Sequence, residues 1–515
     1  MVLFTTEQTP RIVCEQEGMI QLNPTTDGLQ VTLLPSGKPI KAFQLCWDFD
    51  ASAYTKILCD CWGVADGNLG WFALKPVHPA QWYFTLFGAN GCFSVGVKTG
   101  CNSFCSWQIE ADKITLTCDV RNGGGGVHLT EPLACCTVIS AATQENESPQ
   151  QHVKRFCRMM CDKPNVANSP IYGFNTWYYT YGAITRASVL KDAVLCNLQA
   201  SGRVEGAPLP YMVIDDGYTG NRTAAFNGGP YPPNEDFGDM KVVADEIYER
   251  GCTPGIWVRP LLINPQLCPQ LTEDCFSQNQ QFSKDGFSKI LDPTTTGAKE
   301  YIYRLINGMA TSGYGLIKYD FTACDFMGDD FLKTSLTFDG WHLQDKTKTN
   351  AQILKDLYRL IEDAAAGSLV LSCNTYNHLV AGIHPLTRSG CDTSGEHWWL
   401  TKRNGINALV YRLAQNGTFF TTDADCAAFT EKVPIDKNMQ FADLIARCNS
   451  ALFVSAAPGV LTTAQIDQLM EIFRIASSSP DEAEFLDWMD QRTPERFMWN
   501  GKELRYDWGD DSIDG

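Results

Sequence analysis

The feature that most limits how this 515-residue chain can fold is an alternation of short apolar segments with amphipathic helical segments, repeated from about residue 165 to 478. Each apolar segment ends in polar or acidic residues, which is typical of parallel strands that are followed by crossover helices. Eight strand-then-helix repeats close into a (β/α)8 barrel, and we predict that fold. The expected strands span 171–179, 211–218, 254–262, 315–322, 368–375, 385–392, 418–425 and 451–458.

The residues before the barrel follow a different pattern. Between residues 10 and 145, short alternating segments are separated by glycine, proline, asparagine and aspartate, which is typical of an antiparallel β-sandwich. The polar stretch 143–151 has few apolar residues, so we place the end of an N-terminal sandwich domain, residues 1–150, there. The catalytic barrel is expected over 165–478. Residues 479–515 form a short C-terminal extension that can add a few strands.

Composition narrows the partners that the chain can have. Hydrophobic residues make up 44% and charged residues 19%, which is a globular composition. The formal net charge is −18 and Lys and Arg form no continuous run, so we expect neither nucleic acid nor a membrane as partner. No segment approaches the roughly 18 apolar residues that span a bilayer, and the first residues do not resemble a signal peptide. We therefore expect a cytoplasmic protein.

The chain has 21 cysteines, which raises the question of disulfides and metal sites. Without an export signal, cysteines more often act as small buried hydrophobic residues. The pairs Cys59/Cys61 and Cys135/Cys136 lack the repeated C-x2-C spacing of a zinc site, and no H-E-x-x-H motif is present. We expect neither a metal nor a cofactor.

Carboxylates gather at the ends of the expected strands. Active sites of (β/α)8 barrels lie at the C-terminal ends of the strands, so these side chains are expected to meet in one cleft. Like charges raise one another's pKa, and such a cluster therefore needs cations, a metal or the hydroxyl groups of a sugar. The carboxylates are Asp215 and Asp216 on the second strand, Asp320 on the fourth, Asp392 on the sixth, and Asp423 and Asp425 on the seventh.

Two carboxyl groups are the minimum for cleaving a glycosidic bond. One attacks the anomeric carbon and the other protonates the leaving oxygen, and they lie about 5–5.5 Å apart when configuration is retained. Asp320 and Asp392 come from strands on one side of the barrel mouth, which is compatible with that separation. Asp423 and Asp425 remain alternatives for the second role by the same strand-end argument.

Six segments in order resemble motifs of glycoside hydrolase family 36 and its clan relatives, which include α-galactosidases, α-N-acetylgalactosaminidases and raffinose-synthase-like enzymes. The resemblance covers roughly residues 165–460 and the plan of an N-terminal sandwich. The segments are FNTWYY, VIDDGY, GIWVRP, IKYDF, LSCN and RSGCD.

The resemblance implies a retaining α-glycosidase that hydrolyses terminal, non-reducing α-linked galactose or a close analogue such as N-acetylgalactosamine. It makes Asp320 the nucleophile and Asp392 the acid/base. An oligosaccharide or glycoconjugate is then the substrate, and a homo-oligomer is compatible because relatives often assemble. The substrate-binding residues that it implies are Trp177, Asp215, Asp216, Trp257, Arg259, Lys318, Cys373, Asn374 and Arg388.

Two departures from the family pattern leave the sugar open. Arg259 stands where the related motif has Glu, and it can bind the carboxylate of an acidic sugar or neutralise a neighbouring Asp; we favour the ion pair. The Gly-rich segment after Cys373 is replaced by NTYNHLVAG, which carries Tyr376 and His378. Transglycosylation of the raffinose-synthase type and a catalytically inactive sugar-binding barrel stay as alternative functions.

Overall fold

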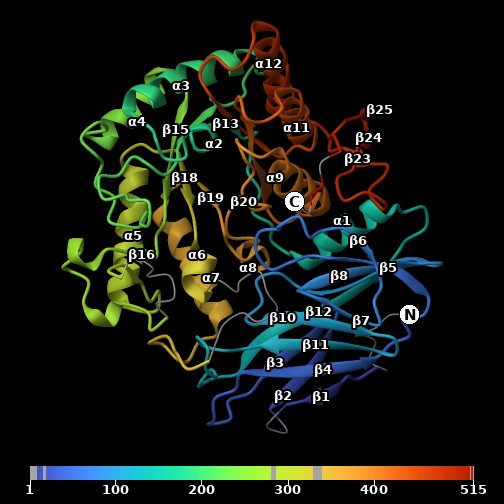
Figure 1. Ribbon diagram of the computed structural model, residues 1–515. Helices are drawn as coiled ribbons and strands as arrows, with labels where there is room; N and C mark the ends of the chain where they lie inside the picture. The colour runs from blue at the N-terminus through green and yellow to red at the C-terminus, as the bar shows by residue number, and fades with distance from the viewer. Residues whose placement is uncertain (1–7, 15–18, 280–285, 329–338, 511, 514–515) are drawn as a thin grey trace.

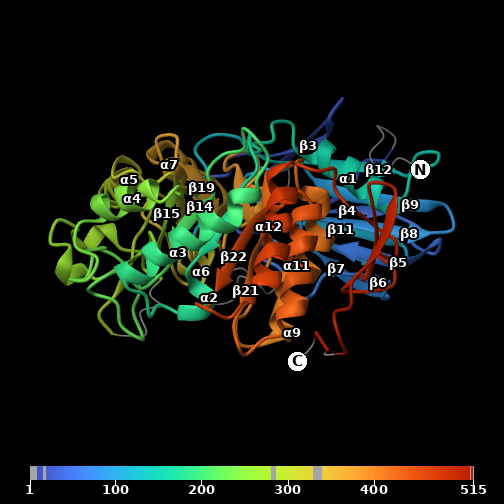
Figure 2. The same ribbon diagram turned by 90° about the horizontal axis from the view of Figure 1, so that it is seen from above.

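The computed structural model places a barrel and a β-sandwich side by side, as two views show (Figure 1, Figure 2). It describes residues 8–14, 19–279, 286–328, 339–510 and 512–513. Residues 1–7 and 15–18 belong to the N-terminal stretch in which we expect no signal peptide, and they lie outside these ranges. In the described part of the chain, no helix has both the length and the apolar character needed to cross a bilayer.

Eight parallel strands form a closed barrel, and each pairs with the next in chain order until the last pairs with the first. This confirms the predicted (β/α)8 fold. Every one of the eight expected segments overlaps a barrel strand. The strands are β13 (Tyr172–Asn175), β14 (Tyr211–Ile214), β15 (Thr253–Val258), β18 (Leu316–Tyr319), β19 (Leu369–Ser372), β20 (Leu386–Arg388), β21 (Thr421–Phe429) and β22 (Ala451–Ala456).

Helices surround the barrel because their apolar stripes cover the strands. Side chains cap the N-termini of most of them; at α7, for example, Thr349 accepts from the backbone of Gln352, whose side chain accepts from Thr349 in return. In both views α11 and α12 lie next to each other (Figure 1, Figure 2). The main helices are α3 (Arg186–Gln199), α4 (Met240–Glu249), α5 (Thr296–Thr311), α7 (Asn350–Ala364), α11 (Ile435–Arg447) and α12 (Thr463–Ser477).

Some barrel strands are shorter than the apolar segments suggest. The first was expected to continue to residue 179, but β13 ends at Asn175, whose side chain accepts a hydrogen bond of 2.8 Å from the Trp177 N–H and starts the short helix α2 (Trp177–Thr180). The sixth, β20, ends at Arg388, so Asp392 lies in the following loop. At β13, the polar side chain of Asn175 bonds the local backbone and ends the ladder early.

The N-terminal residues form two antiparallel sheets, which confirms the predicted sandwich. Along β4 (Ala42–Asp48), β3 (Gly28–Leu33) and other strands, buried and more exposed residues alternate, as the two faces of a half-buried sheet require. One sheet has the order β1 (Arg11–Val13), β4, β11 (Lys113–Asp119), β10 (Phe104–Glu110) and β7 (Val77–Ala80); the other has the order β2 (Ile20–Thr25), β3, β12 (Leu133–Ala142), β9 (Gly91–Val97), β8 (Tyr83–Gly88), β5 (Tyr54–Cys59) and β6 (Trp71–Ala73).

The sandwich and the C-terminal residues are packed against the barrel. Helix α1 (Pro149–Met160) follows the polar stretch 143–151. The last strands, β23 (Glu484–Phe485), β24 (Arg496–Trp499) and β25 (Lys502–Arg505), form a small sheet of their own. Near it, the ring of Trp488 lies against that of Trp71 in the sandwich, with centroids 5.5 Å apart.

Candidate active site

Asp320 follows the fourth barrel strand and is held by three N–H donors. Its Oδ1 accepts from the Phe321 N–H at 2.7 Å and from the Asn374 Nδ2 at 2.5 Å. Its Oδ2 accepts from the Trp257 Nε1 at 3.2 Å. Among the residues that the structure describes, no cation forms an ion pair with Asp320. The carboxylate is therefore oriented by neutral donors.

Asp215 and Asp216 follow the second strand and are each paired with a cation. The Lys318 Nζ donates to the Asp215 Oδ2 at 2.8 Å, and the Asn175 Nδ2 donates to the same oxygen at 2.7 Å. Burial acts to raise the pKa of Asp215, but Lys318 outweighs it and the pKa is lowered. The Arg222 Nε lies 2.9 Å from the Asp216 Oδ2, yet burial raises the pKa of Asp216. Strand ends thus bring three predicted residues together.

Asp392 lies beyond the end of β20, where its side chain is 64% exposed. The Arg388 Nη2 donates to its Oδ1 at 3.0 Å. The pKa of Asp392 is raised to about 6, first by the enclosing protein and then by the charges of Asp425 and Asp320, against the effect of Arg388. The exposed part of the side chain leaves the carboxyl within reach of a bound molecule. An accessible carboxyl that is protonated near neutral pH can give a proton to a bound molecule.

Asp425 is the buried anchor of Arg388. Its Oδ2 accepts from the Arg388 Nη2, from the Tyr178 hydroxyl, and from the Thr393 N–H at 2.8 Å and hydroxyl at 3.1 Å. Asp425 has a φ of 71°, in the left-handed region, where β21 loses its register with β22. Four donors on one oxygen hold the carboxylate of Asp425 in place. Asp423 is also buried, and burial and the charge of Asp425 raise its pKa to about 6.

Solved structures match the fold, although no protein-family model and no curated protein matches the chain in sequence. An α-galactosidase from Thermus thermophilus, in complex with p-nitrophenyl α-D-galactopyranoside, matches at a TM-score of 0.62 and 16% identity over 97% of this chain and 99% of that chain. A family 36 α-galactosidase from Geobacillus stearothermophilus, in complex with 1-deoxygalactonojirimycin, matches at 0.61 and 15% over 92% and 73%. An α-galactosidase from Lactobacillus brevis matches at 0.61 and 12% over 92% and 71%. This chain has the α-galactosidase fold.

Within the α-galactosidase fold, Arg259 is engaged by protein groups. Its Nε and Nη2 donate to the two oxygens of Asp325 at 2.9 and 2.5 Å, its Nη1 donates to the Asn227 Oδ1 at 2.7 Å, and its guanidinium lies 4.2 Å from the centre of the Phe321 ring. Burial raises the pKa of Asp325, although Arg259 opposes the effect. The bidentate pair uses an edge of N–H donors that would otherwise bind the carboxylate of a sugar.

The residues that the sequence reasoning missed are partners of the predicted ones. Asp325 lies in the short helix α6 (Thr322–Met327), and Arg222 and Asn227 lie in the loop after β14. Tyr178 holds Asp425 from α2. Asp325, Arg222 and Asn227 each lie within about a dozen residues of a strand-end acid, and Tyr178 lies three residues after the strand-end Asn175. This signal is too weak to separate them from ordinary loop residues.

Two further predicted residues contact the site through other groups. The Arg388 Nη1 lies 3.7 Å from the buried Cys373 Sγ, so the thiol faces a cation. Trp177 is half-buried, and its ring lies against Tyr181 with centroids 5.7 Å apart. In the described residues, the group of three ligand atoms close enough to share a metal ion is Cys105, Cys118 and Cys136, which belongs to the sandwich and lies outside the barrel mouth.

Proposed function

We propose that this protein is a retaining exo-α-glycosidase that removes terminal, non-reducing α-linked galactose or a close analogue such as N-acetylgalactosamine. The observation that carries the proposal is the contrast between two carboxyl groups at the mouth of an α-galactosidase-like barrel. Asp320 is held by three neutral donors, and Asp392 is solvent-accessible with a raised pKa. A nucleophile and an acid need these opposite environments.

In this mechanism Asp320 attacks the anomeric carbon. Its Oδ1 already accepts two hydrogen bonds, whereas its Oδ2 accepts one from Trp257, so Oδ2 keeps a lone pair for the attack. The C–O bond to the leaving group breaks as the new bond forms, and a glycosyl ester with Asp320 results. Water later attacks the same carbon and releases the carboxylate.

Asp392 supplies the proton in the first step and takes one in the second. As a carboxylic acid it protonates the leaving oxygen, and as a carboxylate it accepts a proton from the attacking water. A pKa of about 6 allows both forms near neutral pH. Arg388, which is held in turn by Asp425, fixes the position of the acid and stabilises its charged form between the two steps.

The remaining predicted residues would bind the sugar. Asp215 and Asp216 can accept from vicinal hydroxyls, and Lys318 keeps Asp215 ionised for this purpose. Trp257 would wall the pocket, since an aromatic face packs well on sugar C–H bonds. We include a cytoplasmic location in this proposal, because the 21 cysteines are all free thiols, as a reducing compartment requires.

The proposal is tested with a panel of p-nitrophenyl α-glycosides of galactose, N-acetylgalactosamine, glucose and a uronic acid. We expect turnover of one or both of the first two, with retained anomeric configuration by NMR. Asp320→Ala is expected to lower kcat by at least about 10³-fold, because covalent catalysis is lost. Inversion of configuration, or an Asp320→Ala variant within tenfold of wild type, would contradict the mechanism.

The same panel separates the alternative functions. If added oligosaccharide diverts most of the product into new glycosides, the enzyme is a transglycosidase. If no glycoside is turned over but galactose still stabilises the protein, the barrel is a sugar-binding one. Labelling by an α-galactosyl cyclophellitol, with the modified peptide mapped to Asp320, is the expected result for an active enzyme and requires no knowledge of the leaving group.

A further inference from the structure

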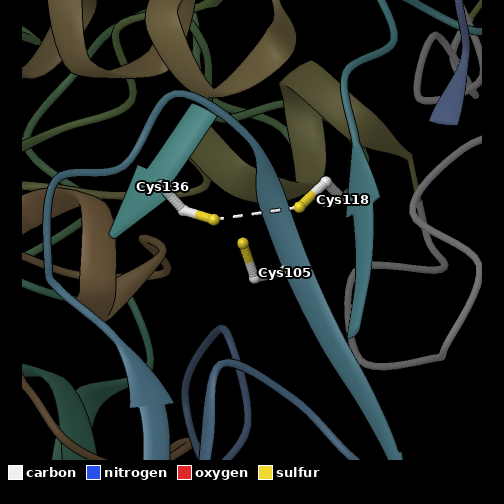
Figure 3. A group of neighbouring side chains, drawn as sticks. All are labelled: Cys105, Cys118 and Cys136. Atoms are coloured by element: carbon white, nitrogen blue, oxygen red, sulfur yellow. Dashed lines mark hydrogen bonds between the residues drawn. The ribbon is translucent and has the colours of Figure 1, made fainter. Parts of the chain in front are cut away.

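Three cysteine sulfurs meet inside the sandwich, and none of them belongs to the candidate active site of the barrel. Cys105 lies on β10 and Cys118 on β11, directly opposite each other in the register of one sheet. Cys136 lies on β12 of the other sheet, where the pairing with β3 shifts between Ala134 and Cys136. Such a bulge re-aims side chains, and here it accompanies a sulfur that faces the opposite sheet. Figure 3 shows the three sulfurs pointing toward one another.

The spacing of the sulfurs is that of metal ligands. The Sγ atoms of Cys118 and Cys136 are 3.8 Å apart, and all three Sγ atoms lie within 4.8 Å of one another. Two sulfurs bound to one ion at about 2.3 Å lie about 3.8 Å apart in tetrahedral geometry and about 4.0 Å apart in trigonal geometry. A disulfide would need a separation near 2.05 Å. The three side chains therefore need little movement to enclose an ion.

We propose that Cys105, Cys118 and Cys136 bind a soft d10 metal ion that joins the two sheets of the sandwich. The ion that fits best is Cu(I), because soft thiolates select it and three sulfurs can complete its shell. Zn(II) in structural sites is almost always four-coordinate, and the described residues provide no fourth ligand atom within the cluster. Binding displaces protons from the thiols, and those protons go to solvent.

The surroundings favour an ion that is held firmly and is shielded from water. Cys105 and Cys118 are fully buried and Cys136 is 5% exposed. The Ser103 hydroxyl lies 3.4 Å from the Cys105 Sγ, so it can donate to a thiolate there. Because the site is enclosed, we expect the ion to enter during folding.

The position of the cluster gives the ion a structural consequence. Phe104, next to Cys105, packs edge-on against Tyr376 with ring centroids 4.8 Å apart. Tyr376 follows Asn374, which holds Asp320, by two residues. An ion that links β10 to β12 would therefore stabilise the side of the sandwich that supports this barrel loop. The proposal stands on the sulfur geometry alone and is independent of the proposed glycosidase activity.

The first experiment measures metal content. The full-length protein is produced in medium containing copper and zinc and is purified under reducing conditions. It is then treated with a chelator that removes metal ions from partly exposed thiols such as Cys391. We expect about one copper ion per chain by mass spectrometry of the digested protein. X-ray absorption of the same sample should show only sulfur neighbours, about three at roughly 2.3 Å. One zinc ion per chain would support the three-cysteine site but identify its metal as zinc in place of copper.

Variants locate the ion. Cys118→Ser and Cys136→Ser are expected to lose it, whereas Cys157→Ser, at a fully buried cysteine of α1, should keep it. If a variant does not fold, wild-type protein produced with and without copper still tests the proposal, since the loaded form should melt at a higher temperature. The proposal is overturned if wild type holds no ion, if Cys118→Ser retains it, or if peptide mapping finds a Cys118–Cys136 disulfide.

Discussion

Replacement of Asp392 by asparagine should separate proton transfer from the rest of catalysis. The pKa of Asp392 is raised to about 6, so about one carboxyl in ten is protonated at pH 7. With an ordinary pKa near 3.9, that fraction would be roughly one in 1,300. The barrel mouth therefore increases the supply of acid at pH 7 by about a hundredfold. The amide has a similar shape but is too weak an acid to transfer a proton to the leaving oxygen.

The assay is kcat/KM against pH for α-galactosides whose leaving groups differ in basicity. For a sugar leaving group, wild-type activity should fall as pH rises through about 6, because the acid form of Asp392 is lost above that pH. Asp392→Asn should lower kcat/KM for this substrate by about 10²–10⁴-fold and abolish that limb. For α-galactosyl fluoride, which needs no protonation, the first step should change by less than about tenfold.

The result that refutes the reasoning is an Asp392→Asn enzyme that keeps the wild-type limb near pH 6. The acid would then be another group, and Asp423 is the candidate because its pKa is also raised to about 6. The wild-type pH profile does not distinguish Asp392 from Asp423, because both have a pKa raised to about 6. The comparison of leaving groups in the Asp392→Asn variant is therefore needed. Asp392→Gly with added azide is the control, because azide attacks the glycosyl ester in place of water without help from a general base. It should restore the second step, release the Asp320 carboxylate and give a glycosyl azide.

Three further variants test the surroundings of the site. Asp423→Asn should raise Tm at pH 7 more than at pH 4. Because the pKa of Asp423 is higher in the folded than in the unfolded protein, its carboxylate destabilises the fold, and that penalty develops as pH rises from about 4 to 6. Equal shifts of Tm at the two pH values would contradict this. Arg259→Ala should destabilise by about 3–5 kcal/mol in urea titrations, because Asp325 is left buried and unpaired, and Arg259→Ala with Asp325→Ala should recover part of the loss; no recovery would argue against the pair. Trp257→Phe should lower kcat about tenfold with little change in KM, since the hydrogen bond to Asp320 is lost while the ring is kept; unchanged kcat would remove Trp257 from the mechanism.

The strands and helices were predictable because their signals are local. An apolar segment followed by an amphipathic one specifies a strand and its helix within about thirty residues, and the eight repeats leave little choice of architecture. The ends of elements were less predictable. Asn175 ends the first strand through a side-chain bond to the next turn, and such bonds compete with the ladder in a way that apolar patterning does not reveal.

The partners of the strand-end residues needed the tertiary structure. Arg259 and Asp325 form a pair because of the way helix α6 turns after its strand. Asp425 forms an ion pair with Arg388 because a bulge in β21 changes the direction of its side chain. The roles of Asp320 and Asp392 remain predictions, to be decided by the experiments above.

The sequence by itself determined that this chain forms a (β/α)8 barrel behind a β-sandwich, and which strand ends carry acids, because periodicity and strand order are properties of neighbouring residues. Only the tertiary structure decided which acids are neutralised, which one is exposed, and that three cysteines from two sheets meet at one point. These outcomes depend on contacts between residues far apart in the chain, whose distances and burial determine charge and proton affinity.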